Sequence, residues 1–147
     1  MLGLADATPS IKGVVGWINF ENPNNLAHLG RFTAHLKFLG VRPMFQDIPD
    51  VNWMLREDIQ WAFRAIIDLD ITFDALGFPI HLPNFLTLIK RYPEMRVVYD
   101  HCMKPQICDQ RAGKDAFSYW AAGMSRLADE TRGCCKISGI VTEAGNG

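Results

Sequence analysis

The sequence has little net charge and no long apolar run. Its formal net charge is −1, and no cluster of lysine and arginine is longer than Lys90-Arg91, so we expect neither nucleic acid nor a membrane as a partner. No apolar run approaches the roughly 18 residues that a membrane-spanning helix needs. The N-terminal residues lack the basic region of a secretory signal. We therefore expect an ordinary soluble globular protein.

Cysteine is also scarce. The four cysteines, Cys102, Cys108, Cys134 and Cys135, include no Cys-x-x-Cys pair, which argues against a zinc knuckle. A disulfide framework would be unusual in a chain of this size, so we expect a reducing, cytoplasmic setting. Cys134 and Cys135 fall within a predicted strand, where packing is a more natural role than reactivity.

The 147 residues, 48% hydrophobic and 21% charged, are enough for one domain with a real core. Apolar segments of strand type begin near residues 11, 38, 71, 96 and 134, and apolar residues at helical spacing occupy the intervals. This alternation, in successive units of about 30 residues, predicts an α/β fold with parallel strands and right-handed crossovers.

Two α/β architectures share this alternation, the doubly wound open sheet and the (β/α)8 TIM barrel. The Gly-x-Gly-x-x-Gly turn and the P-loop of many open sheets are absent, which favours the barrel. A complete barrel needs eight strands and about 250 residues, whereas this sequence has five strands. Residues 1–147 are therefore predicted to form a single domain that is either an open sheet or part of a barrel.

Titratable side chains gather where the predicted strands end, which is where barrel enzymes place their active sites. The clearest example is an apolar strand that ends in Asp100, His101 and Lys104. His101 is either a metal ligand or general base, or a histidine satisfied by a backbone carbonyl. Asp100 is expected to orient a neighbour or cap the turn. Lys104 either binds a carboxylate or hydroxyl of a ligand or is an ordinary solvated lysine.

Two other strand ends carry candidates. Arg42 and Gln46 follow the second strand. Arg42 precedes a proline and should be extended, so it can clamp a ligand carboxylate through two hydrogen bonds or pair with an acid such as Asp74. His81 follows the third strand, and its side chain either faces the same pocket as His101 or contacts the start of the next helix; the second alternative has slightly more weight.

Several motifs occur in the order and spacing of a known family. They are Gly13-Val14-Val15-Gly16-Trp17, Gly40-Val41-Arg42-Pro43-Met44 with Gln46-Asp47-Ile48, Thr72-Phe73-Asp74, His81-Leu82-Pro83, Asp100-His101 with Lys104-Pro105, and Cys135-Lys136-Ile137-Ser138-Gly139. In these motifs the chain resembles the amidohydrolase-related proteins of the sugar-lactonase type, which include L-fuconolactonase and L-rhamnonolactonase. The resemblance runs from about Ile11 to Ala144.

The resemblance implies a (β/α)8 barrel, of which these strands are the third to seventh, and hydrolysis of a sugar lactone or a related ester or amide. His101 matches a histidine of the family's catalytic or metal-binding centre at the end of the sixth strand. Four other residues match positions that line the same pocket and are expected to bind substrate: Arg42, Gln46, His81 and Lys104.

The sequence also departs from the family pattern. The His-x-His pair of the family's first strand and the aspartate of its eighth strand are both absent. We therefore expect an internal fragment that is inactive or nearly so by itself, and that does not firmly hold the single zinc-like divalent metal of the intact enzyme. Exposed sheet edges favour self-association. The alternatives are a non-catalytic fragment and an open α/β domain that binds a small anion through Arg42 and Lys104.

Overall fold

A computed structural model describes residues 1–107 and 113–144. In these residues a five-stranded parallel sheet has the strand order β1-β2-β3-β4-β5, so consecutive strands along the chain are neighbours. The strands are β1 (Val14–Gly16), β2 (Phe38–Val41), β3 (Thr72–Ala75), β4 (Val97–Tyr99) and β5 (Cys134–Cys135).

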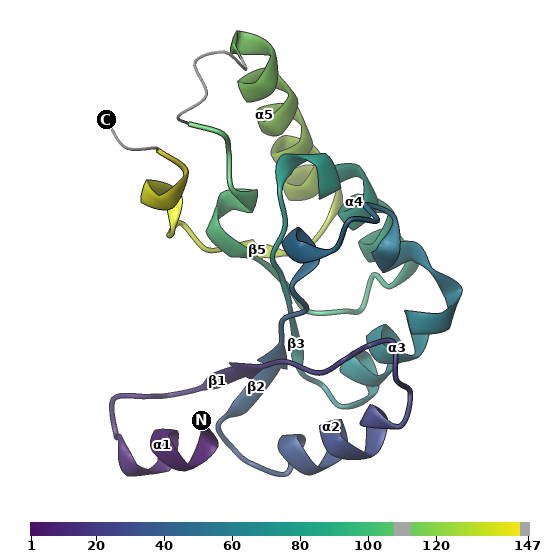
Figure 1. Cartoon of the computed structure of the whole chain (residues 1–147), viewed down its shortest axis with the longest axis vertical. Helices are drawn as coiled ribbons and strands as arrows, with labels where there is room; N and C mark the ends of the chain where they lie inside the picture. The colour runs from purple at the N-terminus through teal and green to yellow at the C-terminus, as the bar shows by residue number, and fades with distance from the viewer. Residues whose placement is uncertain (108–112, 145–147) are drawn as a thin grey trace.

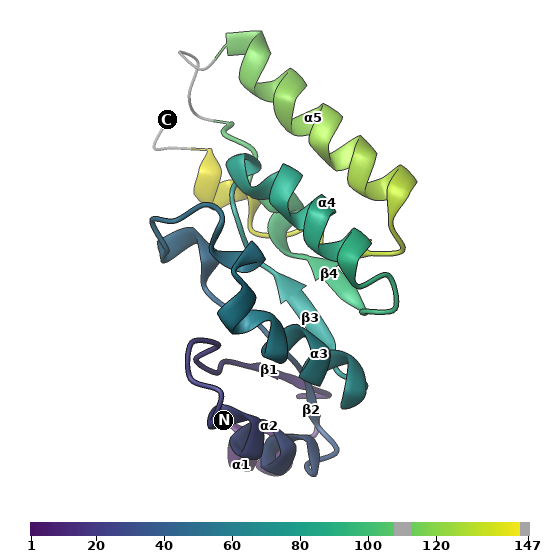
Figure 2. The same ribbon diagram turned by 90° about the vertical axis from the view of Figure 1, so that its right-hand side faces the viewer.

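Helices connect the strands, and short 3-10 helices occupy several of the loops. The α-helices are α1 (Leu2–Ala7), α2 (Asn25–Thr33), α3 (Gln60–Asp68), α4 (Leu82–Arg91) and α5 (Gly113–Glu130). The chain forms an arc in which α2, α3 and α4 lie on the convex side (Figure 1). The perpendicular view shows α5 alongside α4, with α3 below them (Figure 2).

In the aromatic core, side chains from the loops that follow the strands pack against side chains of the outer helices. Its five phenylalanines are almost fully buried: Phe20, Phe45, Phe63, Phe73 and Phe85. Phe73 of β3 meets Phe45 and Phe63 edge to face, with ring centroids 5.8 and 5.4 Å apart, and Phe45 meets Phe85 of α4 at 5.3 Å. Such geometry adds to the energy of burial, so the strand ends are held on a rigid base.

The strands and helices follow the predicted order, with one local correction at β5. Helix α4 begins at Leu82, with proline in its first turn, where proline is well tolerated. Asn84 of this helix donates to the carbonyl oxygen of Val51 at 2.7 Å. Phe117 of α5 is exposed.

The correction concerns β5. Cys134 and Cys135 were expected to pack inside a strand, but both are exposed. They form a two-residue strand at one edge of the sheet, and β1 forms the other edge. No helix in the described part of the chain is both long and apolar enough to cross a membrane.

Candidate active site

Four charged residues lie at the carboxyl ends of four neighbouring strands. Arg42 directly follows β2, Asp74 lies in β3, Asp100 directly follows β4, and Lys136 directly follows β5. Pairing of Val41 with Phe73 places Arg42 next to Asp74, and pairing of Tyr99 with Cys135 places Asp100 next to Lys136. The parallel register therefore gathers two cations and two carboxylates at one edge of the sheet. We call these four residues the charged cluster.

The two carboxylates of the charged cluster are buried, whereas its two cations are partly open to solvent. The side chains of Asp100 and Asp74 are 0% and 2% exposed, and those of Arg42 and Lys136 are 40% and 42% exposed. Arg42 Nη1 donates to Asp100 Oδ2 at 3.2 Å. Lys136 Nζ lies 2.8 Å from Asp100 Oδ1 and also donates to Asp74 Oδ2. Each buried charge thus has an opposite charge beside it, as a buried ion needs.

Burial and charge shift the pKa values within the charged cluster. Burial raises the pKa of Asp74 above its ordinary value, and the neighbouring Asp100 charge acts in the same direction, against the hydrogen bond from Lys136. For Lys136, burial disfavours the charged form, but hydrogen bonds to Asp100 and Asp74 outweigh it and raise the pKa. The ammonium of Lys136 therefore stays charged between the two carboxylates.

A left-handed turn follows Asp100. The φ angles of His101, Cys102, Met103 and Lys104 are 54°, 50°, 57° and 50°, and none of these residues is a glycine. Such a conformation costs roughly 1–2 kcal/mol per residue, so the surrounding contacts must hold it. Cys102 N–H donates to the Lys136 carbonyl at 3.1 Å, and Trp120 Nε1 donates to the Cys102 carbonyl at 2.7 Å. Strain of this kind concentrates at functional sites.

The turn points His101 toward the segment after β5. Its Nδ1 lies 3.0 Å from the hydroxyl oxygen of Ser138. Gly139 has φ +63°, and a Cβ atom at this position would lie 2.5 Å from His101 Nδ1. A glycine is therefore required here both for the left-handed backbone and for the close approach of the imidazole.

His81 and Lys104 both contact Phe78. The His81 ring stacks on Phe78 with centroids 6.4 Å apart, and its Nδ1 accepts a hydrogen bond from Phe78 N–H at 3.0 Å. Burial lowers the pKa of His81. Lys104 Nζ lies 5.2 Å from the centroid of the Phe78 ring and 3.3 Å from Glu143 Oε1. His81 thus makes the helix-start contact given as its second alternative, and Lys104 has an acidic partner.

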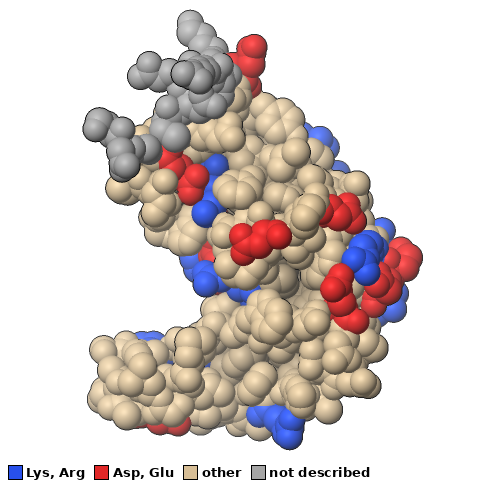
Figure 3. Space-filling model, viewed as in Figure 1, with Lys and Arg blue, Asp and Glu red and all other residues tan. Residues whose placement is uncertain are grey.

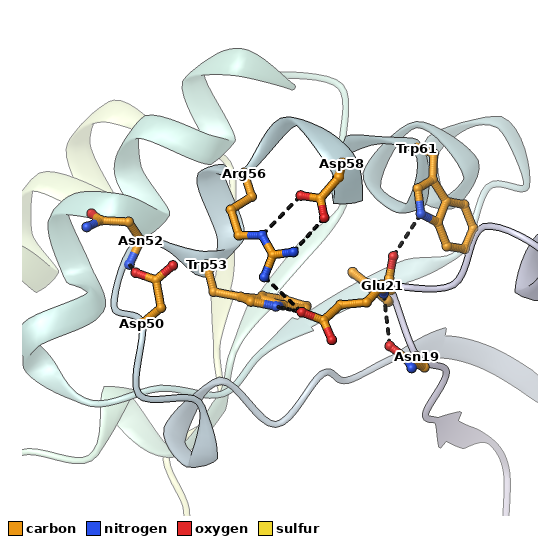
Figure 4. Close-up of polar contacts among 9 residues, drawn as sticks. Asn19, Glu21, Asp50, Asn52, Trp53, Arg56, Asp58 and Trp61 are labelled. Carbon is orange, nitrogen blue, oxygen red and sulfur yellow. Dashed lines mark hydrogen bonds and ion pairs between the residues drawn. The ribbon is translucent and has the colours of Figure 1, made fainter.

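The polar residues after β1 serve a structural network. Glu21 accepts hydrogen bonds from Trp53 Nε1 at 3.0 Å and from Arg56 at 2.8 Å, and Arg56 also binds Asp58 (Figure 4). Asn19 accepts a hydrogen bond from Glu21 N–H at 2.9 Å. These contacts join the loop after β1 to the 3-10 helices that precede α3. The carboxylates of Glu21 and Asp58 are both engaged in this network.

Gln46, the remaining predicted pocket residue, contains a polar atom without a partner. Its Oε1 is buried, and no described residue donates a hydrogen bond to it. A buried carbonyl oxygen without a donor costs about 1–3 kcal/mol. Gln46 lies in the 3-10 helix Phe45–Asp47, which follows the strand that carries Arg42, so this acceptor lies on the segment next to the charged cluster.

The residues described here do not make a metal centre by themselves. Across residues 1–107 and 113–144, no group of three or more histidine, cysteine, aspartate or glutamate side chains is arranged to hold a metal ion. Three protein ligands are the usual minimum for zinc. The imidazole of His101 contacts Ser138 rather than a second ligand.

The structure thus separates four of the five predicted site residues, all except Gln46, into three groups. Arg42 belongs to the charged cluster, His101 follows Asp100 in the chain and contacts Ser138, and His81 and Lys104 both contact Phe78. The predicted site residues did not include Asp74, Asp100 and Lys136, although all three belong to the family motifs. The charges of the four cluster residues on adjacent strands, plus-minus-minus-plus from Arg42 to Lys136, are a signal that becomes useful once the strand register is known.

Comparisons with known proteins identify the family. The sequence matches the amidohydrolase family over residues 2–146. It is 37% identical over 145 residues to an L-fucono-1,5-lactonase of Burkholderia ambifaria, covering 99% of this chain and 48% of the relative. It is 31% identical over 147 residues to an L-fucono-1,5-lactonase of Burkholderia multivorans, covering 98% of this chain and 49% of the relative.

A solved structure supports the same assignment. An amidohydrolase from Burkholderia multivorans with bound zinc superimposes with a TM-score of 0.86 at 30% identity, covering 97% of this chain and 49% of that protein. The chain thus spans about half the length of the relatives it matches. The five parallel β/α units are part of a (β/α)8 barrel, as predicted. The placement of these strands as third to seventh stays a prediction.

Proposed function

The chain belongs to the amidohydrolase family, and from this premise we propose that it carries part of the active site of an enzyme that opens a sugar-acid lactone. Two relatives are L-fucono-1,5-lactonases. The observation that carries the proposal is the charged cluster of Arg42, Asp74, Asp100 and Lys136 at the carboxyl ends of the strands. Figure 3 shows basic and acidic side chains side by side on the hollowed side of the molecule.

The composition of the charged cluster suits a neutral, hydroxyl-rich substrate. Two cations and two carboxylates leave no net charge, so electrostatics does not demand an anionic ligand. Arginine and lysine offer several N–H donors, and carboxylates accept hydrogen bonds from hydroxyl groups. Arg42 uses one of its five donors on Asp100. The remaining donors are suited to the hydroxyl and carbonyl oxygens of a lactone.

Lys136 is the residue best suited to the reacting carbonyl. An ammonium has three N–H donors. One is donated to Asp74 Oδ2, and Asp100 Oδ1 lies 2.8 Å from the same nitrogen. A remaining donor is available for the lactone carbonyl oxygen, whose negative charge grows as water adds to the carbonyl carbon. Donors held in place before the reaction stabilise such an oxyanion strongly. The ring C–O bond then breaks, and the ring oxygen leaves as a hydroxyl group.

The predicted site residues complete this proposal. Arg42 and Gln46 orient the substrate hydroxyl groups, His81 and Lys104 line the pocket, and His101 acts in proton transfer beside Asp100. Zinc, which the related structure contains, would polarise the lactone carbonyl when bound in the intact enzyme. Because the described residues do not form a metal centre, we propose that this chain alone opens lactones no faster than buffer, or nearly so.

A chimeric protein tests two proposals independently: that the chain carries part of a lactonase active site, and that the 147-residue chain alone is inactive. Residues 1–147 replace the matching half of the Burkholderia ambifaria relative, and acid release from L-fucono-1,5-lactone is followed in a pH-stat. We expect the chimera to be active and the 147-residue chain to be inactive. A folded chimera that opens no lactone would refute the lactonase proposal. Lactone opening by the chain alone at rates like those of full-length relatives would refute the inactivity proposal.

Two variants of the chimera test the proposed role of Lys136. Lys136→Met removes the donor and is expected to lower kcat by roughly 10²–10³-fold, the usual cost of losing an oxyanion donor. The matched control is Lys12→Met, which replaces an exposed lysine and should leave kcat unchanged. Lys12 lies just before the N-terminal end of β1, whereas the charged cluster lies at the carboxyl ends of the strands. Equal activity of the two folded variants would contradict the role of Lys136.

The small-anion-binding alternative receives less support from the geometry. Its two proposed cations are already paired, Arg42 with Asp100 and Lys104 with Glu143. A free anion would have to displace these carboxylates or bind beside them against their repulsion. A neutral lactone meets no such obstacle.

We also propose that the isolated chain self-associates. Strands β1 and β5 are the two edges of the sheet, and unpaired edges are templates for pairing with another chain. Large apolar side chains near both edges are exposed, including Trp17 at 60% and Ile137 at 85%. Self-association would bury part of this surface.

A further inference from the structure

A pair of cysteine thiols lies beside the charged cluster, and the proposed lactone chemistry does not use it. Cys102 belongs to the left-handed turn after β4, and Cys135 ends β5. Pairing of Tyr99 with Cys135 brings these two segments together. The two cysteines lie far apart in the sequence, so no cysteine motif predicts that they are neighbours.

Both sulfur atoms approach the same acceptor. Cys102 Sγ lies 3.7 Å and Cys135 Sγ lies 3.9 Å from the carbonyl oxygen of Lys136. Burial, together with the neighbouring Cys102 thiol, raises the pKa of Cys135 to about 11. The backbone N–H of Cys102 donates to the same carbonyl at 3.1 Å. The pair is therefore set by the backbone as well as by side-chain rotamers.

The two thiols are free and open to solvent to different degrees. Cys135 is exposed, and Cys102 is partly exposed. Cys134 is also exposed, but successive side chains of a strand point to opposite faces of the sheet. Cys134 is therefore directed away from the face on which Cys135 meets Cys102. It provides a matched comparison one residue away. Cys108 lies outside the described residues.

We propose that Cys102 and Cys135 are an oxidation site, at which hydrogen peroxide converts the two thiols into an intramolecular disulfide. The thiolate of Cys102 attacks the peroxide, whose O–O bond breaks, and becomes a sulfenic acid while hydroxide leaves. The second thiol attacks the sulfenic sulfur, an S–S bond forms, and water leaves with the sulfenic oxygen. The pair loses two electrons, and the peroxide gains them.

The proposed disulfide would join the turn that carries His101 to the strand end that carries Lys136. It would close a long loop that contains α5, and closing a loop lowers the entropy of the unfolded chain. Oxidation is therefore expected to raise the Tm of the chain, and reduction with dithiothreitol should reverse the shift.

The test compares two variants of the 147-residue chain. Cys108→Ser/Cys134→Ser keeps only Cys102 and Cys135, whereas Cys108→Ser/Cys135→Ser keeps only Cys102 and Cys134. After limited peroxide treatment, free thiols are titrated and intact mass is measured. The first variant is expected to lose both thiols and two hydrogens in mass. The second should form an intramolecular disulfide at least about tenfold more slowly, because its thiols point apart.

Wild-type chain supplies a measurement that does not depend on serine variants folding. Lys104 precedes Pro105, so trypsin leaves Cys102 and Cys108 in one peptide, 97–111, and Cys134 and Cys135 in another, 133–136. Fragmentation of the cross-linked peptides should identify a link between Cys102 and Cys135. Equal disulfide rates in the two variants, another pairing in wild type, or oxidation that yields only sulfinic acid or intermolecular dimers would overturn the proposal.

Discussion

Replacing Lys136 with methionine should destabilise the chain in a pH-dependent way. Methionine keeps most of the side-chain volume but removes the ammonium that contacts both buried carboxylates. Asp100 keeps Arg42 as a partner at 3.2 Å. Asp74 keeps no ion-pair partner among the described residues and still faces the charge of Asp100. The loss of stability is therefore expected to come mainly from the unpaired carboxylate of Asp74.

The size of the effect follows from the burial of the two partners. Removing one partner of a buried ion pair costs about 3–5 kcal/mol. The Lys136 side chain is 42% exposed, so solvent screens part of the attraction, and we expect a loss of about 2–3 kcal/mol at pH 7. For a chain of this length, that corresponds to a fall in Tm of about 5–10 °C.

The sign of the pH dependence distinguishes this cause from a packing defect. The pKa of Asp74 is already raised in the folded chain, and loss of Lys136 should raise it further. A carboxyl group whose folded pKa is raised favours the folded state most below its ordinary pKa, and that contribution is lost as the pH rises through the folded value. The Lys136→Met defect should therefore be large at pH 7 and shrink as the pH falls toward 3.8, the ordinary value for this group.

Urea unfolding, followed by tryptophan fluorescence at several pH values, measures this defect. The matched background is Asp74→Asn, in which the same substitution of Lys136 should cost clearly less at pH 7, because no buried charge is left without a partner. An equal cost in both backgrounds, or a cost that does not change with pH, would show that Asp74 is not the cause.

Two further predictions concern the turn and the sheet edges. Gly139→Ala, at φ +63° and with its Cβ 2.5 Å from His101 Nδ1, should lower the free energy of unfolding by about 1–2 kcal/mol or more. The control in urea unfolding is Gly30→Ala in α2, where a Cβ meets nothing within 4 Å. Equal stability of the two variants would contradict the clash. Sedimentation velocity of the isolated chain should show oligomers that increase with concentration, because β1 and β5 leave two unpaired edges; a clean monomer with cooperative unfolding would count against this.

The fold was predictable because its signal is repetitive. Alternating apolar strands and amphipathic helices specify parallel βαβ units wherever they occur, and the strands expected near residues 38 and 134 begin at Phe38 and Cys134. The local error concerns Cys134 and Cys135, which are exposed in a two-residue strand at one edge of the sheet. Cysteine is usually a buried residue, and the position of a strand in the sheet is not visible in the sequence.

The charged cluster was less predictable because it depends on pairing between strands. Sequence spacing showed Arg42 at a strand end, but it could not choose between Asp74 and Asp100 as its partner. The partner is Asp100, which lies two strands away in the sheet. The left-handed turn from His101 to Lys104 was also invisible, since it contains no glycine and L-residues rarely adopt this conformation. Tertiary contacts impose it.

These two unpredicted features depend on one another. Asp100 is fully buried and holds Arg42 from one side and Lys136 from the other, so it links strand ends that belong to β2 and β5. The turn must leave the strand immediately after Asp100, and the Lys136 carbonyl that anchors Cys102 belongs to the residue whose ammonium binds Asp100. Lys136 thus fixes both the carboxylate and the strained backbone that follows it. A change at Lys136 should therefore disturb His101 as well, although the two side chains bind different partners.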